Sequence, residues 1–278
     1  MAKKKSTKKV EKNDSRGSEV TKVTPSFLEK IAAEDTSVEE LKGYRVLSRI
    51  KVVQAMSDSN VKEQFGEGAV VLQPGNALVA DPRASFLFVP LFFFVEFISW
   101  KDRRDQGGSP IEARSFDKAG DIARKSRSAD DRFEVYPGGP KSDPYKMRHV
   151  EHLNFAGVIY GDHELGMTPV AISFAKGELN VGKNLCSAAL LRKAGAHVAP
   201  LWSQVWEFGT ATRDRGGNTW WGIDFANPTG GESPFIKEDE VETFKGFHDD
   251  LKALHDASRL AVDQGDDGSE GSADSGEF

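Results

Sequence analysis

The sequence predicts a mainly β protein in which a small antiparallel barrel carries added helices. Strand-type alternation of apolar and polar residues recurs in many short segments, and Gly and Pro separate these segments. One longer segment, 86–100, has apolar side chains on both alternating faces, as a buried central strand does. A β sandwich would give a similar pattern, so the sequence alone leaves that architecture open.

The first elements follow a basic segment. Residues 1–24 are rich in Lys, Ser and Asp and cannot bury enough apolar surface to fold, so we expect a disordered arm. Its lysines favour contact with phosphate groups, and a solubilising role is the alternative. A short helix is expected from Pro25 to about Ala33. The segments whose alternation then predicts strands are 44–52, 69–73 and 76–80.

Residues 86–100 (FLFVPLFFFVEFISW) give the strongest signal for a hydrophobic core. The segment is too short for a membrane helix and contains Pro90 and Glu96, so we predict a central strand that is kinked or bulged at Pro90. The next segment, 101–131, is basic and rich in Gly, Ser and Asp, with few core-forming residues. We therefore expect a long irregular basic loop there, of the kind that is functional or disordered in compact domains.

The second half of the chain continues the mainly β pattern. A helix is expected over 178–193, and a long hairpin then pairs LWSQVWEFGTAT with TWWGIDFA. Gly216 and Gly217 supply the positive φ angles that the hairpin turn needs. An apolar stripe predicts a final helix over 236–262. The remaining predicted strands are 132–136, 149–160 and 168–175.

These elements form one predicted domain over residues 25–262, between charged ends. The chain of 278 residues has a net charge of −6, and its last segment, 263–278, alone carries six carboxylates and no base. The body is therefore near neutral. The single Cys186 excludes a disulfide framework and a cysteine-built zinc site. No apolar segment follows the basic start, so we expect no secretion signal and a cytoplasmic location.

Cationic and aromatic residues are interleaved in the middle and late parts of the chain. Single-strand binding without sequence preference needs cations along the phosphates and aromatic faces that stack the bases. Adjacent strand residues point to opposite faces, so one of Trp220 and Trp221 should be in the core and the other exposed. Core aromatics with a solvated rim of charges are the alternative. The DNA-binding candidates are Trp100, Lys101, Arg103, Arg104, Arg114, Arg124, Lys125, Arg127, Arg132, Tyr145, Lys146, Arg148, Arg213, Arg215, Trp220 and Trp221.

The last segment, 263–278, combines an acidic run with a terminal aromatic residue. Its composition predicts disorder, and a lone aromatic ring beside the terminal carboxylate suits a basic, apolar pocket of a partner. A tail that only solubilises the protein is the alternative. The partner-binding candidates are Asp266, Asp267, Asp274, Glu277 and Phe278.

Three stretches and the tail resemble a known family. RIKVVQAMS, VEFISWKDRRDQGGSPIEARS and PLWSQVWEFGTATRDRGGNTWWGIDFANP, with the Phe-terminated tail, resemble the single-stranded DNA-binding proteins of T7-like and other tailed phages over residues 45–278. The loop 101–131 and the basic arm are larger than a minimal barrel needs, so their role is open.

The resemblance implies an oligonucleotide-binding (OB-fold) barrel that is no enzyme and needs no cofactor. Such a protein coats single-stranded DNA in phage replication and recombination, in the host cytoplasm and away from membranes. Its tail recruits replication proteins such as the polymerase and helicase-primase. Whether the chain forms a homo-oligomer stays open.

One motif instead favours a nucleotide-dependent enzyme. Residues 177–184 (GELNVGKN) nearly match the phosphate-binding loop G-x-x-x-x-G-K-[ST] and lie between a predicted strand and a predicted helix. However, Asn184 replaces the Ser or Thr hydroxyl that should contact Mg²⁺. This enzyme and a structural virion protein with charged packing arms remain the alternatives. We assign no catalytic residue and no metal ligand.

Overall fold

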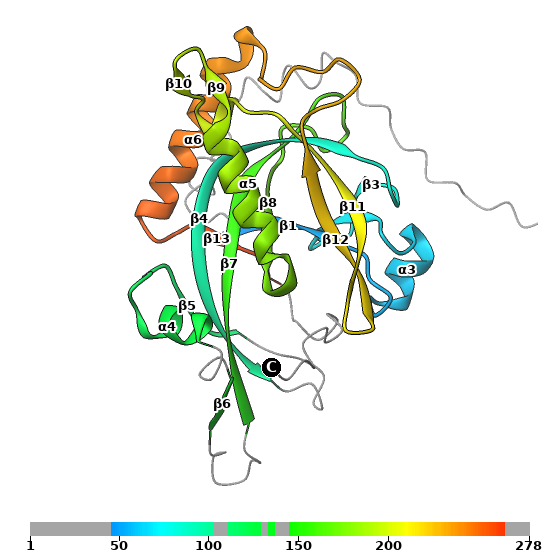
Figure 1. Cartoon of the computed structure of the whole chain (residues 1–278), viewed down its shortest axis with the longest axis vertical. Coiled ribbons are helices and arrows are strands. Elements are labelled where there is room, and N and C mark those ends of the chain that lie inside the picture. Colours follow the sequence, from blue (N-terminus) through cyan, green and yellow to red (C-terminus); the bar gives the residue numbers. More distant parts are fainter. Residues whose placement is uncertain (1–45, 103–110, 129–132, 137–144, 265–278) are drawn as a thin grey trace, which may run out of the picture. The chain divides into compact units, whose positions relative to one another are not determined.

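The structure is a computed structural model, and part of the chain is described in it (Figure 1). The predicted basic arm 1–24, the helix predicted from Pro25 to Ala33 and the segment 265–278 lie outside the described residues. The described residues are 46–102, 111–128, 133–136 and 145–264.

Eleven strands form one mixed sheet that dominates the described chain (Figure 1). They are β1 (Val46–Val52), β2 (Val70–Gln73), β3 (Leu78–Ala80), β4 (Phe86–Asp102), β5 (Ile111–Ser115), β6 (Phe133–Tyr136), β7 (Tyr145–Tyr160), β8 (Pro169–Ala175), β11 (Trp206–Arg215), β12 (Asn218–Ala226) and β13 (Ala261–Val262). Their order is β12-β11-β4-β7-β8-β1-β2-β3, with β13 beside β1, β5 beside β4 and β6 beside β7. The prediction of a mainly β fold is therefore confirmed.

The backbone pairings of the described strands form an open path rather than a closed barrel. β12 and β3 are its two ends, and β1 pairs with β8 in parallel while the neighbours along the path are otherwise antiparallel. Side-chain hydrogen bonds nevertheless connect the β11–β12 hairpin to segments beside β1 and β2. Thr210 Oγ1, on β11, donates to the carbonyl oxygen of Gly68, just before β2, at 2.9 Å. The sheet is therefore curled, with a gap that side chains bridge.

The long strand β4 forms the centre of the sheet, as predicted. It pairs with β7 along nearly its whole length, and the register shifts between Pro90 and Phe92, which confirms the predicted bulge. Opposite the bulge, a Cβ atom on Gly157 would lie 2.2 Å from the carbonyl oxygen of Val89. Only glycine therefore allows the two strands to approach this closely.

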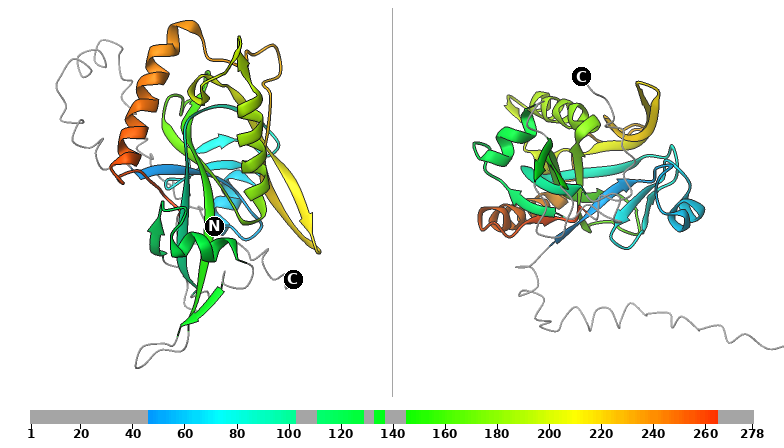
Figure 2. Two further views of the ribbon diagram at one scale, coloured as in Figure 1. Left: turned by 60° about the vertical axis from the view of Figure 1, so that its left-hand side comes forward. Right: turned by 90° about the horizontal axis from the view of Figure 1, so that it is seen from below.

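Two long helices cover opposite faces of this central part of the sheet (Figure 2). They are α5 (Leu179–Leu191) and α6 (Val241–Asp256). Leu185 of α5 packs in the core cluster that contains Phe88 and Phe155, whereas Phe244 of α6 packs in the cluster that contains Leu91 and Phe94. β4 is therefore buried on both faces, as its all-apolar pattern requires. No helix in the described ranges is long and apolar enough to cross a membrane.

Two sequence-based predictions about regular structure were wrong. The stretch predicted as an irregular loop, 101–131, contains β5 and the short helix α4 (Asp121–Arg127), which is anchored by the fully buried Ala123. The final helix ends at Asp256 rather than at 262, because Leu260 and Val262 are buried and β13 pairs with β1. A further short helix, α3 (Ser59–Phe65), was not predicted.

Candidate nucleic-acid groove

A hollow of about 660 Å³ lies where β1, β7 and β8 meet the β11–β12 hairpin. The short 3₁₀ helix η2 (Lys176–Glu178), which leads into α5, also contributes to its lining. We call this hollow the groove. It is lined by residues that include the cations Arg49, Lys51, Arg148 and Lys176 and the aromatic residues Trp100, Phe174, Trp220 and Trp221.

The groove cations come from neighbouring strands and the turn after them. β7, β8 and β1 are adjacent in the sheet. Arg148 lies on β7, Arg49 and Lys51 lie on β1, and Lys176 directly follows β8. Arg49 is held in place, because its Nη1 donates to Gln264 Oε1 at 3.1 Å and its Nη2 donates to Gln73 Oε1 at 3.4 Å. The groove lining therefore contains three cations from β1 and β7 and one, Lys176, from η2.

The adjacent residues Trp220 and Trp221 have different neighbours, as expected for opposite faces of a strand, but both are half-buried, so neither is the exposed residue that was predicted. Trp221 packs against the core cluster, and a Cβ atom on Gly68 would lie only 2.9 Å from its ring. Trp220 instead donates from Nε1 to Glu178 Oε1 at 3.0 Å, and its ring would lie 3.3 Å from a Cβ atom on Gly177. Both indoles line the groove, and Trp220 is the one that does not pack against the core cluster.

The side chain of Gln54 holds the hairpin beside the groove. Its Nε2 donates to the carbonyl oxygen of Trp221 at 2.6 Å, and its Oε1 accepts from the Trp221 amide at 2.9 Å. At the hairpin turn, Gly216 and Gly217 have φ angles of 60° and 82°, as predicted for this turn.

Two of the predicted DNA-binding residues serve the fold. Trp100 lines the groove, but its side chain is only 2% exposed and packs in a core cluster with Ile98 and Val150. Arg114 donates from Nη1 to Glu96 Oε1 and to the carbonyl oxygen of Val262, both at 3.0 Å. Trp100 was therefore wrong as an exposed stacking residue, and Arg114 joins β5 to the C-terminal strand.

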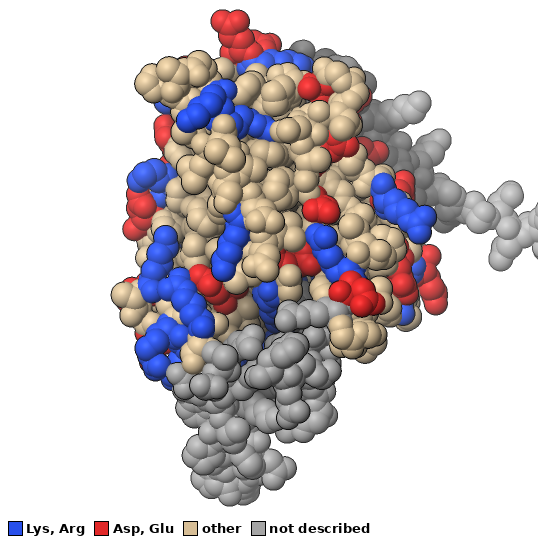
Figure 3. Space-filling view, in the orientation of Figure 1, with Lys and Arg blue, Asp and Glu red and all other residues tan. Residues whose placement is uncertain are grey.

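Further predicted cations form ion pairs around α4, where Lys and Arg side chains gather at the lower left of Figure 3. Arg127 donates to Glu151 Oε1 at 2.8 Å and lies 4.7 Å from the centre of the Phe97 ring. Glu151 also lines the groove, so this basic surface adjoins it. The other pairs are Lys101 with Glu112, and both Arg124 and Lys125 with Asp121.

Some predicted residues cannot be placed, and some groove residues were missed. The groove cations missing from the predicted DNA-binding residues are Arg49, Lys51 and Lys176. Arg49 and Lys51 alternate along β1, which the sequence analysis used only for its apolar residues, and Lys176 lies just before the motif at 177–184. Alternation in β1 is the signal that could have found the first two. The candidates outside the described residues are Arg103, Arg104, Arg132, Asp266, Asp267, Asp274, Glu277 and Phe278, together with the side chains of Tyr145, Lys146 and Arg215.

The motif at 177–184 does not form a phosphate-cradling loop. Its first residues belong to η2, and Gly182 lies inside α5, where a Cβ atom would be 2.8 Å from Phe174 Cβ. Gly182 therefore allows close packing of the helix on β8. Among the described residues, no group of three or more His, Cys, Asp or Glu side chains is arranged to hold a metal ion.

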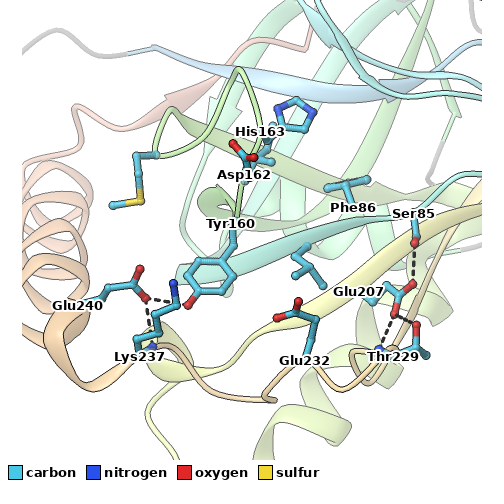
Figure 4. Close-up of a pocket in the computed structure, with 14 residues that line it drawn as sticks. Ser85, Phe86, Tyr160, Asp162, His163, Glu207, Thr229, Glu232, Lys237 and Glu240 are labelled. Atoms are coloured by element: carbon cyan, nitrogen blue, oxygen red, sulfur yellow. Dashed lines mark hydrogen bonds between the residues drawn. The ribbon is translucent and has the colours of Figure 1, made fainter. Parts of the chain in front are cut away.

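A second cavity, of about 620 Å³, has an acidic lining (Figure 4). Tyr160 Oη donates to Glu240 Oε2 at 2.7 Å, and burial together with this carboxylate raises the pKa of Tyr160 to about 12. Hydrogen bonds from Ser85 and Thr229 lower the pKa of Glu207. Since carboxylates repel phosphates, the cavity is a poor site for nucleic acid.

The family of this chain is shown by a match to a family model. Residues 18–240 match the model of a family described as Pam3 phage gp34-like protein, and the match covers more than half of the chain. The chain therefore belongs to the Pam3 phage gp34-like family. The match contains the four groove cations and both hairpin tryptophans. Neither the search of curated proteins nor that of solved structures found a match.

Proposed function

We propose that this phage protein binds single-stranded DNA in the groove during DNA replication and recombination. The observation that carries the proposal is a groove lining that contains four cations together with Trp220 of the hairpin. A single strand can place its phosphates along the cations and stack a base on an indole ring. Such contacts do not depend on sequence, which suits a protein that coats DNA and is no enzyme.

The burial of the arginines supports electrostatic binding in the groove. Arg148 and Arg49 are 5% and 9% exposed, so little water screens their charges from a ligand in the groove. Lys51 and Lys176 are more exposed and add positive charge at its surface. The basic surface around α4 extends this field beyond the groove.

We also propose that the tail recruits replication proteins, such as the polymerase or helicase-primase, through its carboxylates and Phe278. The described chain ends at Gln264, whose side chain accepts a hydrogen bond from the groove residue Arg49. The acidic residues therefore begin next to a cation that is proposed to bind phosphate. This position would link strand binding to the tail.

The proposal is tested by tryptophan fluorescence during titration with oligo-dT and, separately, with ATP. Quenching by oligo-dT should weaken with salt, with a log–log slope of about −0.7 for each phosphate neutralised. Lys51→Gln and Lys176→Gln should each reduce the slope by about that amount. The matched control is Lys245→Gln, because Lys245 is exposed on α6, on the opposite face of the sheet.

Three results would contradict the proposal. A response to ATP alone would favour a nucleotide-dependent enzyme. Binding of oligo-dT that is insensitive to salt would remove the role of the groove cations. No response to either ligand would favour a structural role in the virion.

A further inference from the structure

One carboxylate, that of Glu178, lies among the groove residues on the hairpin side. Its Oε1 accepts from Trp220 Nε1 at 3.0 Å and lies 3.6 Å from Arg213 Nε. It rests on the main chain of β12, since a Cβ atom on Gly222 would be 2.5 Å from Oε1. The absence of a side chain at Gly222 therefore makes room for this carboxylate.

The charge of Glu178 is only partly neutralised. Arg213 lies 3.6 Å from Glu178 and also 3.6 Å from Asp224 Oδ1, so one guanidinium is shared between two carboxylates. The second oxygen of Glu178, Oε2, is buried and accepts no hydrogen bond from the described residues. The other acidic residue in the lining, Glu151, is instead paired with Arg127 at 2.8 Å. Glu178 therefore lines the groove with a carboxylate that only shares the guanidinium of Arg213.

We propose that Glu178 makes the groove selective for unpaired strands over duplex DNA, an inference that rests on the proposed single-strand binding. A single strand can face the cations with its phosphates and turn its bases toward Trp220, so that no phosphate approaches Glu178. A duplex carries phosphates on both edges. When one of its strands lies along the cations, the other brings phosphates to the hairpin side, where like charges repel.

The test compares the affinities of the full-length protein for oligo-dT and for a blunt duplex of equal length, by fluorescence anisotropy at low salt. Glu178→Gln removes the charge but keeps an amide oxygen that can accept from Trp220 Nε1. We expect it to tighten duplex binding by about tenfold while changing oligo-dT binding by less than about threefold. The matched control is Glu242→Gln, which removes a carboxylate that is exposed on α6 and does not line the groove. This control should leave the ratio of the two affinities unchanged.

The outcomes separate the two proposals. If the parent protein binds neither DNA, the proposed function is wrong and the selectivity of Glu178 falls with it. If the parent binds oligo-dT but Glu178→Gln leaves the preference for single strands unaltered, only the role of Glu178 is wrong. An equal loss of preference in Glu242→Gln would also overturn it, because a general charge effect would then explain the result.

Discussion

The side chain of Gln54 pairs with the main chain of Trp221 as a neighbouring strand would. Its amide nitrogen donates to the Trp221 carbonyl at 2.6 Å, and its amide oxygen accepts from the Trp221 N–H at 2.9 Å. β12 is an end strand of the sheet, and exposed strand edges favour unwanted pairing with other chains. One side chain from the segment after β1 thus covers this edge and positions the groove wall.

Gln54→Ala should therefore destabilise the protein by about 1–3 kcal/mol, because two partly buried main-chain groups lose their partners. The free energy of unfolding in urea measures this effect. Gln64→Ala is the matched control, since Gln64 is exposed on α3 and its loss should change stability by less than about 0.5 kcal/mol. Equal effects of the two variants would show that the pairing does not stabilise the hairpin.

Trp220→Ala should weaken DNA binding, whereas Trp100→Ala should reduce stability. Loss of the groove indole Trp220 should weaken oligo-dT binding by about 1–3 kcal/mol if it stacks a base. Loss of Trp100, which is 2% exposed, should instead reduce the free energy of unfolding by about 3–5 kcal/mol. DNA titration and urea unfolding of both variants measure the two effects. Unchanged DNA binding by a folded Trp220→Ala variant would contradict stacking at this position.

Removal of residues 265–278 should tighten DNA binding at low salt and abolish recruitment of the replication polymerase. Gln264, the residue before this segment, contacts Arg49, and a short tether can give carboxylates a local concentration in the millimolar range. The difference from the full chain should vanish near 1 M salt, where the Debye length is about 3 Å. Titration with oligo-dT at two salt concentrations and a pull-down with the polymerase measure these effects.

The structure also places the boundary for this truncation after Gln264. The sequence had assigned 263–278 to the tail, but the Asp263 amide donates to the Leu47 carbonyl at 2.9 Å and Gln264 is 1% exposed. A protein shortened after Val262 should thus unfold more easily than one shortened after Gln264.

Equal DNA affinity with and without the tail, together with unchanged polymerase binding, would reduce the tail to a solubilising segment.

Glu96 should make stability depend on pH in the acidic range. Burial raises the pKa of this carboxyl above its ordinary value of 4.5, and the nearby Arg114 only partly opposes the shift. The protonated form is thus favoured by folding, so its contribution to stability is present below pH 4.5 and is lost as pH rises through the raised pKa.

Glu96→Gln removes this titration but keeps the size of the side chain. The stability of the variant relative to the parent should therefore rise with pH from about 4.5 and level off above the raised pKa. Urea unfolding across the acidic and neutral range measures the difference. A difference that is constant with pH would show that Glu96 does not titrate in this window.

Local patterns in the sequence predicted most of the sheet correctly. Alternation located β1, β7 and β8, and the continuous apolar run located β4 with its bulge at Pro90. Gly216 and Gly217 located the hairpin turn. These features depend on the alternation of side chains along a strand and on local backbone conformation. Residues that are close in sequence determine both.

Local patterns failed where distant contacts decide the structure. α4 forms in a stretch of loop-like composition because Ala123 is buried against the sheet, and the final helix stops early because β13 pairs with β1. The motif at 177–184 is helical because Gly182 packs on Phe174. Apart from Phe174, these partners are distant in sequence, so for α4 and the final helix no short window contains the cause.

The sequence by itself determined the mainly β class, the central strand, the hairpin and the charged ends, because these follow from composition and from periods of a few residues. Only the tertiary structure decided which residues form the groove. Arg49, Arg148 and Trp220 are far apart in the chain, and they meet because β1, β7 and β12 are brought together by the curled sheet. The same curl of the sheet places the carboxylate of Glu178 against Gly222, and no periodic pattern in the sequence indicates this contact.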